Sequence, residues 1–350
     1  MDSPDPTKPN LKSRLGNIQR KSLVVSQESL VHSEPLLPTS LLPLVVSPRL
    51  EGVNLIAWIT GNREWLEKEL LKHGGILFRG FNVKSPEDLE GIIAAISNST
   101  LEYTYRSTPR SQVSGNIYTS TEYPADQSIP LHNEMSYTRT WPMKIWFCSL
   151  IVAQSGGETP IADSRRVYER ISPATRTRFA DKKVMYVRNY GEGIDLPWEE
   201  VFQTTDKSHV EDYCRRHDIA FEWKGDNRLK TSQVCQAVAT HPATGETVWF
   251  NQAHLFHVSS LLPSVREVLL REFTEDELPR NTYYGDGSPI EPAALDEIRE
   301  AFQQESIYFP WQEGDVMMLD NMLAAHGRAP FVGPRKVVVG MAESFGEEDS

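Results

Sequence analysis

The sequence is poor in three features that mark common classes of protein. It has only three cysteines, Cys148, Cys214 and Cys235, and this odd number at wide spacing indicates reduced, buried thiols rather than a disulfide framework. No predominantly apolar run reaches about 18 residues, so no transmembrane helix is expected. The N-terminal residues lack the charged and then apolar pattern of a secretory signal. Together these absences predict a cytoplasmic protein without a membrane partner.

Positive charge is also scarce. The chain has 36 Lys and Arg residues against 48 Asp and Glu residues, which gives a formal net charge of −12. Because nucleic-acid binding depends on Lys and Arg contacts with phosphates, we expect no nucleic-acid partner. Hydrophobic residues make up 39% of the chain and charged residues 24%, which are ordinary values for a globular protein with a sizeable core.

Several ligand-binding motifs are missing as well. The turn GDGSPI (285–290) lacks the G-K-[ST] ending of a phosphate-binding loop, and the turns GGET and YGDG are too short for dinucleotide binding. The zinc-protease motif H-E-x-x-H is absent. His254 and His257 form an H-x-x-H pair that could bind zinc from one face of a helix, but no third ligand follows at a characteristic spacing. We therefore expect a structural or pocket-lining role for this pair.

What the sequence does contain is a candidate iron site. His132 and Glu134 form an H-x-E pair in the run LHNEMSY, and His326 follows much later in the chain. Two imidazoles and one carboxylate are the ligands of the facial triad, which binds Fe(II) on one side and leaves three positions open. The spacing of the pair suits a strand end or the loop after it, and the third ligand has to come from another strand. Taken alone, the pair is also compatible with a surface loop, and His326 with a core histidine.

Two further residues match the needs of an enzyme that uses 2-oxoglutarate. This cosubstrate chelates iron through one carboxylate and its keto oxygen, so its far carboxylate needs a separate binding group. Arg335 lies nine residues after His326, before the apolar run VVVGM, and an arginine presents parallel N–H donors to a carboxylate. Thr159 follows a Gly-Gly turn and adds a hydroxyl donor. Lys336 is a rival cation, but it would point to the opposite face of a strand.

The order of these residues closely resembles the taurine dioxygenase (TauD/TfdA-like) family of Fe(II)/2-oxoglutarate oxygenases. The resemblance covers roughly residues 45–345, and it extends to the SyrP-like branch through the runs YRSTPR, YTSTEYP, GGETPIADSR, LPRNTYYGDGSPI and FPWQEGDVMMLDNMLAAHGRAPF. Enzymes of that branch hydroxylate amino acids, free or tethered to carrier proteins, for natural-product assembly. The resemblance therefore implies Fe(II) as cofactor, 2-oxoglutarate and O2 as cosubstrates, and a small amino-acid-type substrate, free or bound to a carrier protein.

The acidic ligand departs from the pattern of most family members, which have Asp where this chain has Glu134. Glutamate has one more methylene but keeps an anionic oxygen ligand, so the triad is retained. Related halogenases replace this acid with a small residue, which makes room for chloride. A carboxylate at this position therefore favours hydroxylation or desaturation over halogenation.

Candidate substrate contacts are few. A zwitterionic amino acid needs a cation for its carboxylate, and Arg106, which shares the run YRSTPR with Arg110, is our candidate. Asn251, in the run WFNQ, is a further candidate contact.

Two other functions stay open: a cupin-type lyase or isomerase that uses Mn or Zn, and a non-catalytic jelly-roll binding module. Cupins usually carry an H-x-H pair and a later Glu, which are missing here, and a binding module leaves the clustered His, Glu and Arg residues unexplained.

The distribution of strands and helices predicts a mainly β fold with flanking helices. Many strand-like runs occur without regular helix alternation, which argues against a doubly wound sheet. With the resemblance, this predicts a double-stranded β-helix (jelly-roll) core in a single catalytic domain over residues 49–345. Residues 1–48 contain repeated prolines, so we expect an extended or partly disordered arm there. Residues 346–350 are expected to form an acidic tail.

Individual elements follow from periodicity and from capping residues. A helix is expected over residues 54–75, where apolar residues recur at helical spacing until Gly74 and Gly75. Ser85 and Pro86 are typical of a helix start and predict a second helix that runs to Ile96. Further helices are expected at 208–217, 264–273 and 293–304, and strands at 76–81, 145–152, 182–190, 233–251, 316–319 and 337–341.

Overall fold

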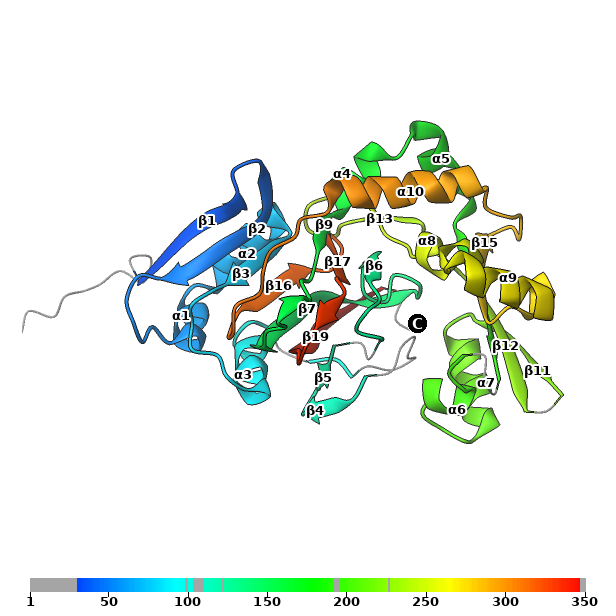
Figure 1. Ribbon diagram of the computed structural model, residues 1–350, viewed down its shortest axis with the longest axis horizontal. Helices are drawn as coiled ribbons and strands as arrows, with labels where there is room; N and C mark the ends of the chain where they lie inside the picture. Colours follow the sequence, from blue (N-terminus) through cyan, green and yellow to red (C-terminus); the bar gives the residue numbers. More distant parts are fainter. Residues whose placement is uncertain are drawn as a thin grey trace, which may run out of the picture.

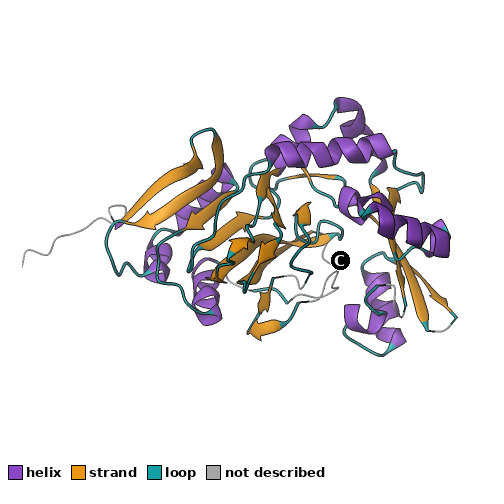
Figure 2. Cartoon of the chain, in the orientation of Figure 1, coloured by secondary structure: helices purple, strands orange, loops and turns teal. Residues whose placement is uncertain are grey.

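Strands form the centre of the molecule, and most helices lie at its periphery (Figure 1, Figure 2). The computed structural model describes residues 30–97, 100–102, 110–120, 123–191, 195–225 and 227–346. Its largest sheet has eight strands and brings together segments that are far apart in the sequence. Their order across the sheet is β1 (Val31–Leu37), β2 (Ser40–Pro48), β3 (Gly75–Phe78), β16 (Val316–Asp320), β7 (Thr140–Ile151), β19 (Lys336–Gly346), β5 (Ile117–Thr119) and β4 (Gln112–Ser114).

The central strands of this sheet bury side chains on both faces. Along β7, Trp146 and Cys148 belong to the core on one face, and Ile145 and Phe147 belong to the core on the other. Successive side chains of a strand point to opposite faces, so a strand that is covered on both sides reads as a continuous apolar run. The first face is covered by the helices α1 (Leu55–Gly61), α2 (Arg63–His73) and α3 (Pro86–Ile96).

A three-stranded sheet packs against the second face and carries two of the predicted iron ligands. Its order is β6 (Ile129–His132), β17 (Ala324–Arg328) and β9 (Ile161–Asp163), and β8 (Ser155–Gly156) pairs separately with β18 (Phe331–Val332). Ile161 and Ala324 share a buried cluster with Ile145 and Phe147 of the large sheet. The two sheets thus form the jelly-roll core that the sequence predicted.

The remaining elements surround a third core on the far side of the small sheet. Leu131, Ala162 and Ala325 of the small sheet contribute to this core. Its strands are β10 (Val184–Tyr190), β11 (Ala220–Lys224), β12 (Arg228–Cys235), β13 (Val238–Thr240), β14 (Thr247–Trp249) and β15 (Arg280–Tyr284). Its helices are α4 (Ser164–Arg170), α5 (Pro173–Lys182), α6 (Trp198–Val201), α7 (Lys207–Arg216), α8 (Ala253–Phe256), η3 (Val258–Ser260), α9 (Pro263–Glu272), η4 (Glu275–Glu277) and α10 (Pro292–Glu305). Among the described residues, no helix has the length and apolar character that a membrane span requires.

The long helix expected at residues 54–75 is two helices, because Asn62 interrupts it. Asn62 is both the C-terminal cap of α1 and the N-terminal cap of α2, with non-helical dihedral angles (φ −130°, ψ 25°). Its side chain donates a hydrogen bond to the carbonyl of Trp58. Asparagine competes with the backbone for hydrogen bonds in this way, which is why it is weak inside a helix. Gly74 ends α2 in the left-handed conformation, as expected.

An extended or partly disordered arm was expected over residues 1–48, and the last part of this segment forms two strands of the large sheet, Val31–Leu37 and Ser40–Pro48. β1 pairs antiparallel with β2, and β2 pairs parallel with β3. Pro35 is tolerated because it lies in the edge strand β1, where a missing N–H costs no bond to a further strand. Residues 1–29 and the expected acidic tail beyond residue 346 lie outside the described residues.

Two helices that follow β9 in the chain were not expected from the sequence, although their start signals are present. Asp163 caps α4 by accepting a bond from the amide of Arg165, and Ser172 with Pro173 starts α5. Their apolar residues are too few to give a clear helical period, and α5 buries only Phe179. The helix after Ser85 is confirmed, with a capping box between Ser85 and Asp88.

Candidate metal centre

Three residues predicted as ligands from the sequence meet at one end of the small sheet. The ligand atoms of His132, Glu134 and His326 all lie within 4.8 Å of one another, and no other group of three or more His, Cys, Asp or Glu residues among the described residues could hold a metal ion in this way. His132 ends β6, Glu134 lies in the turn that follows, and His326 lies directly opposite His132 in β17. Strand pairing therefore brings the late histidine to the H-x-E pair.

His132 is in the state that a metal requires of an imidazole ligand. Nδ1 of His132 lies 2.8 Å from the carbonyl oxygen of Pro130. A carbonyl only accepts, so Nδ1 carries the proton and Nε2 keeps its lone pair for a ligand. Desolvation and the neighbouring His326 lower the pKa of His132 to about 3, so its imidazole is neutral near pH 7. Metal ligation requires neutral imidazole and ionised carboxylate, and His132 meets the first condition.

The carboxylate meets the second condition because of a buried ion pair. Arg110 donates from Nη2 to Oε2 of Glu134 at 2.7 Å, and both side chains are almost fully buried. Burial by itself raises the pKa of Glu134, but Arg110 and His326 lower it below its ordinary value. Oε2 of Glu134 also lies 3.7 Å from Nε2 of His326. Two imidazoles and one carboxylate form the donor set that suits non-haem Fe(II), so these residues fit that ion.

An asparagine that the sequence analysis missed holds the backbone of Glu134. Asn321 accepts a hydrogen bond from the amide of Glu134 at 2.7 Å and donates to its carbonyl at 2.8 Å. It donates also to the carbonyl of Pro142. Asn321 lies in the turn between β16 and β17, five residues before His326 in the run LDNMLAAH. Its place in that run was the available signal, but its partners are distant in sequence.

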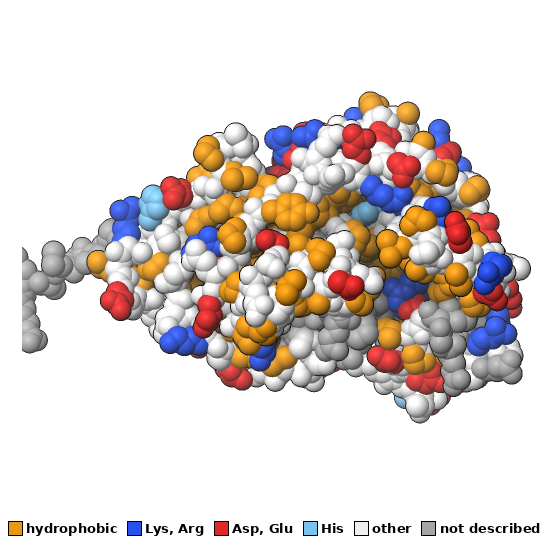
Figure 3. Space-filling model, in the orientation of Figure 1, with side chains coloured by type: hydrophobic (Ala, Val, Ile, Leu, Met, Phe, Trp, Pro, Cys, Tyr) orange, Lys and Arg blue, Asp and Glu red, His pale blue; other side chains and the backbone are white. Residues whose placement is uncertain are grey.

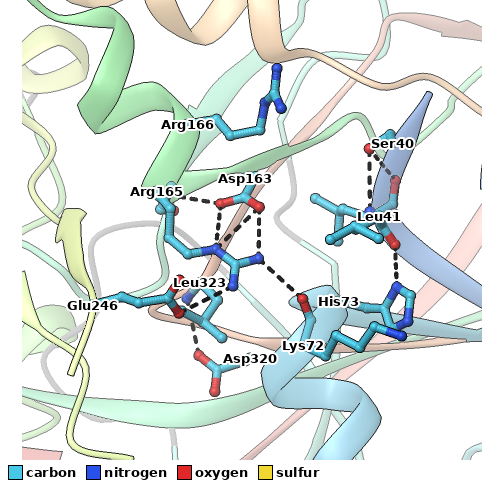
Figure 4. A network of polar contacts seen from close by, with 12 residues as sticks. Ser40, Leu41, Lys72, His73, Asp163, Arg165, Arg166, Glu246, Asp320 and Leu323 are labelled. Atoms are coloured by element: carbon cyan, nitrogen blue, oxygen red, sulfur yellow. Dashed lines mark hydrogen bonds and ion pairs between the residues drawn. The ribbon is translucent and has the colours of Figure 1, made fainter. Parts of the chain in front are cut away.

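The strand that carries His326 is supported by an ionic network on the side of α2 and β14. Arg165 forms an ion pair with Asp163 at 2.7 Å and with Glu246 at 3.2 Å, and it donates to the carbonyl of Lys72 (Figure 4). Asp163 ends β9, which pairs with β17 over the residues next to His326. The network therefore connects the small sheet with the helical layer and with the β13–β14 hairpin.

A small pocket beside the histidines contains both predicted cosubstrate residues. Arg335, Thr159, Arg328, His132 and His326 are among the side chains that line it. Arg335 donates from Nε to the carbonyl of Gly157 at 2.9 Å, and among the described residues no carboxylate forms an ion pair with it. Burial and the nearby Arg328 lower its pKa to about 10, so it stays a cation near pH 7. This side chain can take a carboxylate as its counter-ion.

The hydroxyl of Thr159 is held in place by a tryptophan that the sequence analysis also missed. Nε1 of Trp311 donates to Oγ1 of Thr159 at 3.1 Å. Because the oxygen accepts from the indole, its own proton is directed elsewhere and can be donated to a ligand. Lys336, the rival cation, is exposed at the start of β19 and does not line the pocket.

Arg328 has a different role from Arg335 although both line the small pocket. It donates to the carbonyls of Tyr123, Pro124 and Gln127 at 2.6–2.9 Å. These bonds attach the segment that leads into β6, and therefore His132, to the strand that carries His326. The guanidinium is used by the backbone, which makes Arg335 the better candidate for a cosubstrate carboxylate.

A larger cavity of about 580 Å³ opens on the other side of the three candidate ligands. Its lining shares His132, Ile129 and Arg110 with the small pocket. Its apolar lining residues are Ile129, Pro130, Leu196, Leu255, Phe256, Val258, Leu261, Val265, Leu269, Leu278 and Pro279. The order in space is large cavity, candidate ligands and small pocket, which is the order that a substrate, a metal and a cosubstrate require.

The candidate substrate residues have mixed outcomes. Arg106 lies outside the described residues. Its neighbour Arg110 is in the site, bound to Glu134 and lining both pockets. The structure does not place Asn251 at the cavity: it is fully buried, donates to the carbonyl of Ala237 and accepts from the amide of Ala253. Its amide is used by the backbone, and the next residue, Gln252, lines the cavity instead.

The H-x-x-H pair has the structural and pocket-lining role expected for it. Nε2 of His254 donates to the carbonyl of Leu131 at 3.0 Å, and its ring stacks on Phe302. His257 lines the large cavity, and its Nδ1 accepts from the amide of Ser259. One ring nitrogen of each histidine is used within the fold, and among the described residues the pair belongs to no group of three or more potential metal ligands.

Comparison with known proteins agrees with this geometry. The profile of the Taurine catabolism dioxygenase TauD, TfdA family matches residues 33–341. The chain is 41% identical to the dapdiamide synthesis protein DdaC of Enterobacter agglomerans over 79% of this chain and 84% of that protein. It is 30% identical to a clavaminate synthase-like protein of Arabidopsis thaliana over 86% of this chain and 93% of that protein.

The solved structures extend this likeness to the fold. PvcB of Pseudomonas aeruginosa is similar with a TM-score of 0.54 and 14% identity, over 89% of this chain and 90% of that one. A second structure of PvcB, described as an Fe, alpha-ketoglutarate dependent oxygenase, has a TM-score of 0.52. The family match covers most of the chain and confirms the resemblance drawn from the motifs, and it sets aside the cupin-type and non-catalytic alternatives. The chain belongs to the TauD/TfdA family and is an Fe(II)/2-oxoglutarate-dependent dioxygenase.

Proposed function

We propose that this enzyme hydroxylates an unactivated carbon of an amino acid or amino-acid derivative, with His132, Glu134 and His326 as iron ligands. The observation that carries the proposal is the position of these residues between a large apolar cavity and a small pocket that contains Arg335. The carboxylate of Glu134 is retained, which favours hydroxylation over halogenation. Iron in this site supplies, with 2-oxoglutarate and O2, the oxidising power for a C–H bond.

The residues of the chain position the two organic molecules and exclude water. Arg335 and Thr159 bind the far carboxylate of 2-oxoglutarate through a guanidinium fork and a hydroxyl. The substrate occupies the large cavity, and its apolar walls keep water from the reacting carbon. Arg110 lies at the boundary of both pockets and orients Glu134.

Two observations support an amino-acid substrate in biosynthesis. Runs along most of the chain are similar to the SyrP-like branch, whose enzymes act on amino acids. A relative at 41% identity is named for dapdiamide synthesis, which is consistent with a place in natural-product assembly. We propose the same broad class of substrate for this enzyme, free or tethered to a carrier protein.

The test uses purified protein with Fe(II), 2-oxoglutarate and O2, and a panel of amino acids offered free and as carrier-protein thioesters. We expect succinate release coupled to a product that has gained one oxygen atom, measured by mass spectrometry. Glu134→Ala should lose this product, because a ligand is removed. Succinate release without any oxygenated product from either form of the panel contradicts the amino-acid assignment, and full hydroxylation by Glu134→Ala contradicts the ligand assignment.

A further inference from the structure

The walls of the large cavity bear on the class of substrate. We propose, on the basis of the function proposed above, that the substrate carries an extended apolar group, such as an acyl chain, which lies between α8, α9 and the segment that precedes β15. The reacting carbon lies at the candidate ligands, and the apolar group lies away from them. The inference rests on the size of the cavity, its lining and the way its outer wall is attached.

The cavity is too large for a free amino acid. Its volume of about 580 Å³ corresponds to roughly 19 water molecules at the density of the liquid, since each occupies about 30 Å³. A free amino acid such as leucine, with about nine non-hydrogen atoms, fills less than half of this space even if each atom is given the roughly 30 Å³ of a whole water molecule. Ligand pockets generally bury most of the surface of their ligand, so a tight fit requires a longer molecule.

The chemistry of the outer lining favours an uncharged extension. Leu255, Phe256 and Val258 line the cavity from α8 and η3, and Val265 and Leu269 line it from α9. The described charged side chains of the lining are engaged with one another. Arg110 pairs with Glu134 at 2.7 Å, and Arg280 pairs with Asp195 through two contacts of 2.5 Å. An apolar chain therefore gains burial at these walls without separating an ion pair.

The outer wall of the cavity consists of α8, η3 and α9. Its first residues are fixed to the backbone on both sides of His132. Gln252 donates to the carbonyl of Asn133, and His254 donates to the carbonyl of Leu131, so the two bonds bracket His132. The first part of the wall, α8, is therefore held in a defined position relative to the candidate ligands. Its later part, α9, is attached much more lightly, because none of its residues is buried.

Helix α9 has four exposed or half-buried apolar residues, and only two of them line the cavity. Val265 and Leu269 are one helical turn apart and line the cavity. Val268 and Leu270 do not line it and are each 50% exposed. Hydrophobic side chains are visible at the surface over the region of α8 and α9 (Figure 3). A single helix thus offers both the test positions and matched control positions.

The experiment measures binding of two probe series to the anaerobic enzyme loaded with Fe(II) and 2-oxoglutarate. The probes are N-acylglycines from butanoyl to decanoyl and the matching N-acylglycinamides, which differ in the charge of the head. By isothermal titration calorimetry we expect the affinity to rise by up to roughly fourfold for each methylene that is buried. Val265→Asp and Leu269→Asp should flatten this dependence on chain length, while Val268→Asp and Leu270→Asp keep it. All four variants should fold, because α9 has no buried residue.

Two results overturn the inference. One is a dissociation constant that does not change with chain length in either series. The other is the same flattening in Val268→Asp as in Leu269→Asp, which would place the acyl chain on the outer surface of α9. Failure of the proposed function has a different signature: length-dependent binding persists, but no amino-acid derivative gives an oxygenated product with succinate.

Discussion

The two pockets beside the candidate ligands differ in how they are built. The small pocket lies at strand ends: Thr159 precedes β9, Arg335 precedes β19, and His326 lies within β17. The large cavity is walled by short helices and connecting segments, with α9 as its outer part. Strand pairing gives a single fixed geometry, which suits a cosubstrate shared by a whole family. Walls made of helices and connections can change without disturbing the strands, and this suits a substrate that differs between members.

The largest effect on activity is expected for the candidate ligand histidines, which lie between the two pockets. His132→Ala or His326→Ala removes one of two imidazole ligands, so we expect loss of stoichiometric iron and of coupled turnover. The measurement is metal content after dialysis, together with succinate release. His209→Ala is the control, since its side chain is 70% exposed and lines neither pocket. One iron per chain and an unchanged rate in either ligand variant would contradict the assignment.

Arg110 lines both pockets, so its removal tests the boundary between them. Arg110→Leu leaves Glu134 buried without this cation, and we expect the metal-free protein to lose about 3–5 kcal/mol of stability. A bound divalent cation supplies positive charge to the same carboxylate. Mn(II) should therefore raise the melting temperature of the variant more than that of the parent. Equal metal-induced shifts in the two proteins would show that Arg110 and the metal do not share Glu134.

Arg335→Leu should affect the cosubstrate side alone. Losing one partner of a desolvated charge pair costs about 2–5 kcal/mol, so the apparent affinity for 2-oxoglutarate should fall roughly 30- to 5,000-fold at saturating iron. Arg335→Lys should recover little of this, because a point charge does not reproduce the fork. Lys336→Leu is the matched control, exposed and one residue away. If Arg335→Leu binds 2-oxoglutarate like the parent, the clamp lies elsewhere and Arg328 is the next candidate.

Thr159→Val should give a milder form of the same defect. A neutral hydrogen bond contributes about 0.5–1.5 kcal/mol, which corresponds to roughly 2- to 13-fold in the apparent affinity for 2-oxoglutarate. Thr159→Ser keeps the hydroxyl and should behave like the parent. Titration of both variants with 2-oxoglutarate, followed by succinate release, separates the two cases. An equal loss in the serine variant would indicate that packing around the methyl group, rather than the hydroxyl, matters.

Local patterns account for what could be read from the sequence about the fold. The capping residues Ser85 and Asp88 define the start of α3 through contacts within four residues, and Gly74 ends α2 for the same kind of reason. The apolar runs of β7 and β19 reflect burial on both faces. The pattern could not show that residues 31–48 join the large sheet, because proline content reports on helix formation and says little about an edge strand.

The site was predictable where chemistry limits the choice of residue. Iron ligation restricts the ligands to a few residue types, which pointed to His132, Glu134 and His326 as candidates, and binding of a carboxylate requires a cation, which pointed to Arg335. For residues that only hold the candidate ligands or Thr159 in place, chemistry does not restrict the residue type in this way. Asn321 and Trp311 act through partners that are distant in the sequence, and Asn251 turned out to serve the backbone rather than the cavity.

The sequence by itself determined the helix caps, the apolar strands, the H-x-E pair and the order of the candidate ligands and the candidate cosubstrate residues, because each depends on residue type and spacing along the chain. The tertiary structure decided that His326 lies opposite His132, that Asn321 holds Glu134, and that α8 and α9 wall a cavity on one side of them. These features depend on the pairing of strands from distant parts of the chain. Which side chains such pairing brings together follows from the register and packing of the whole fold, and no local pattern contains that information.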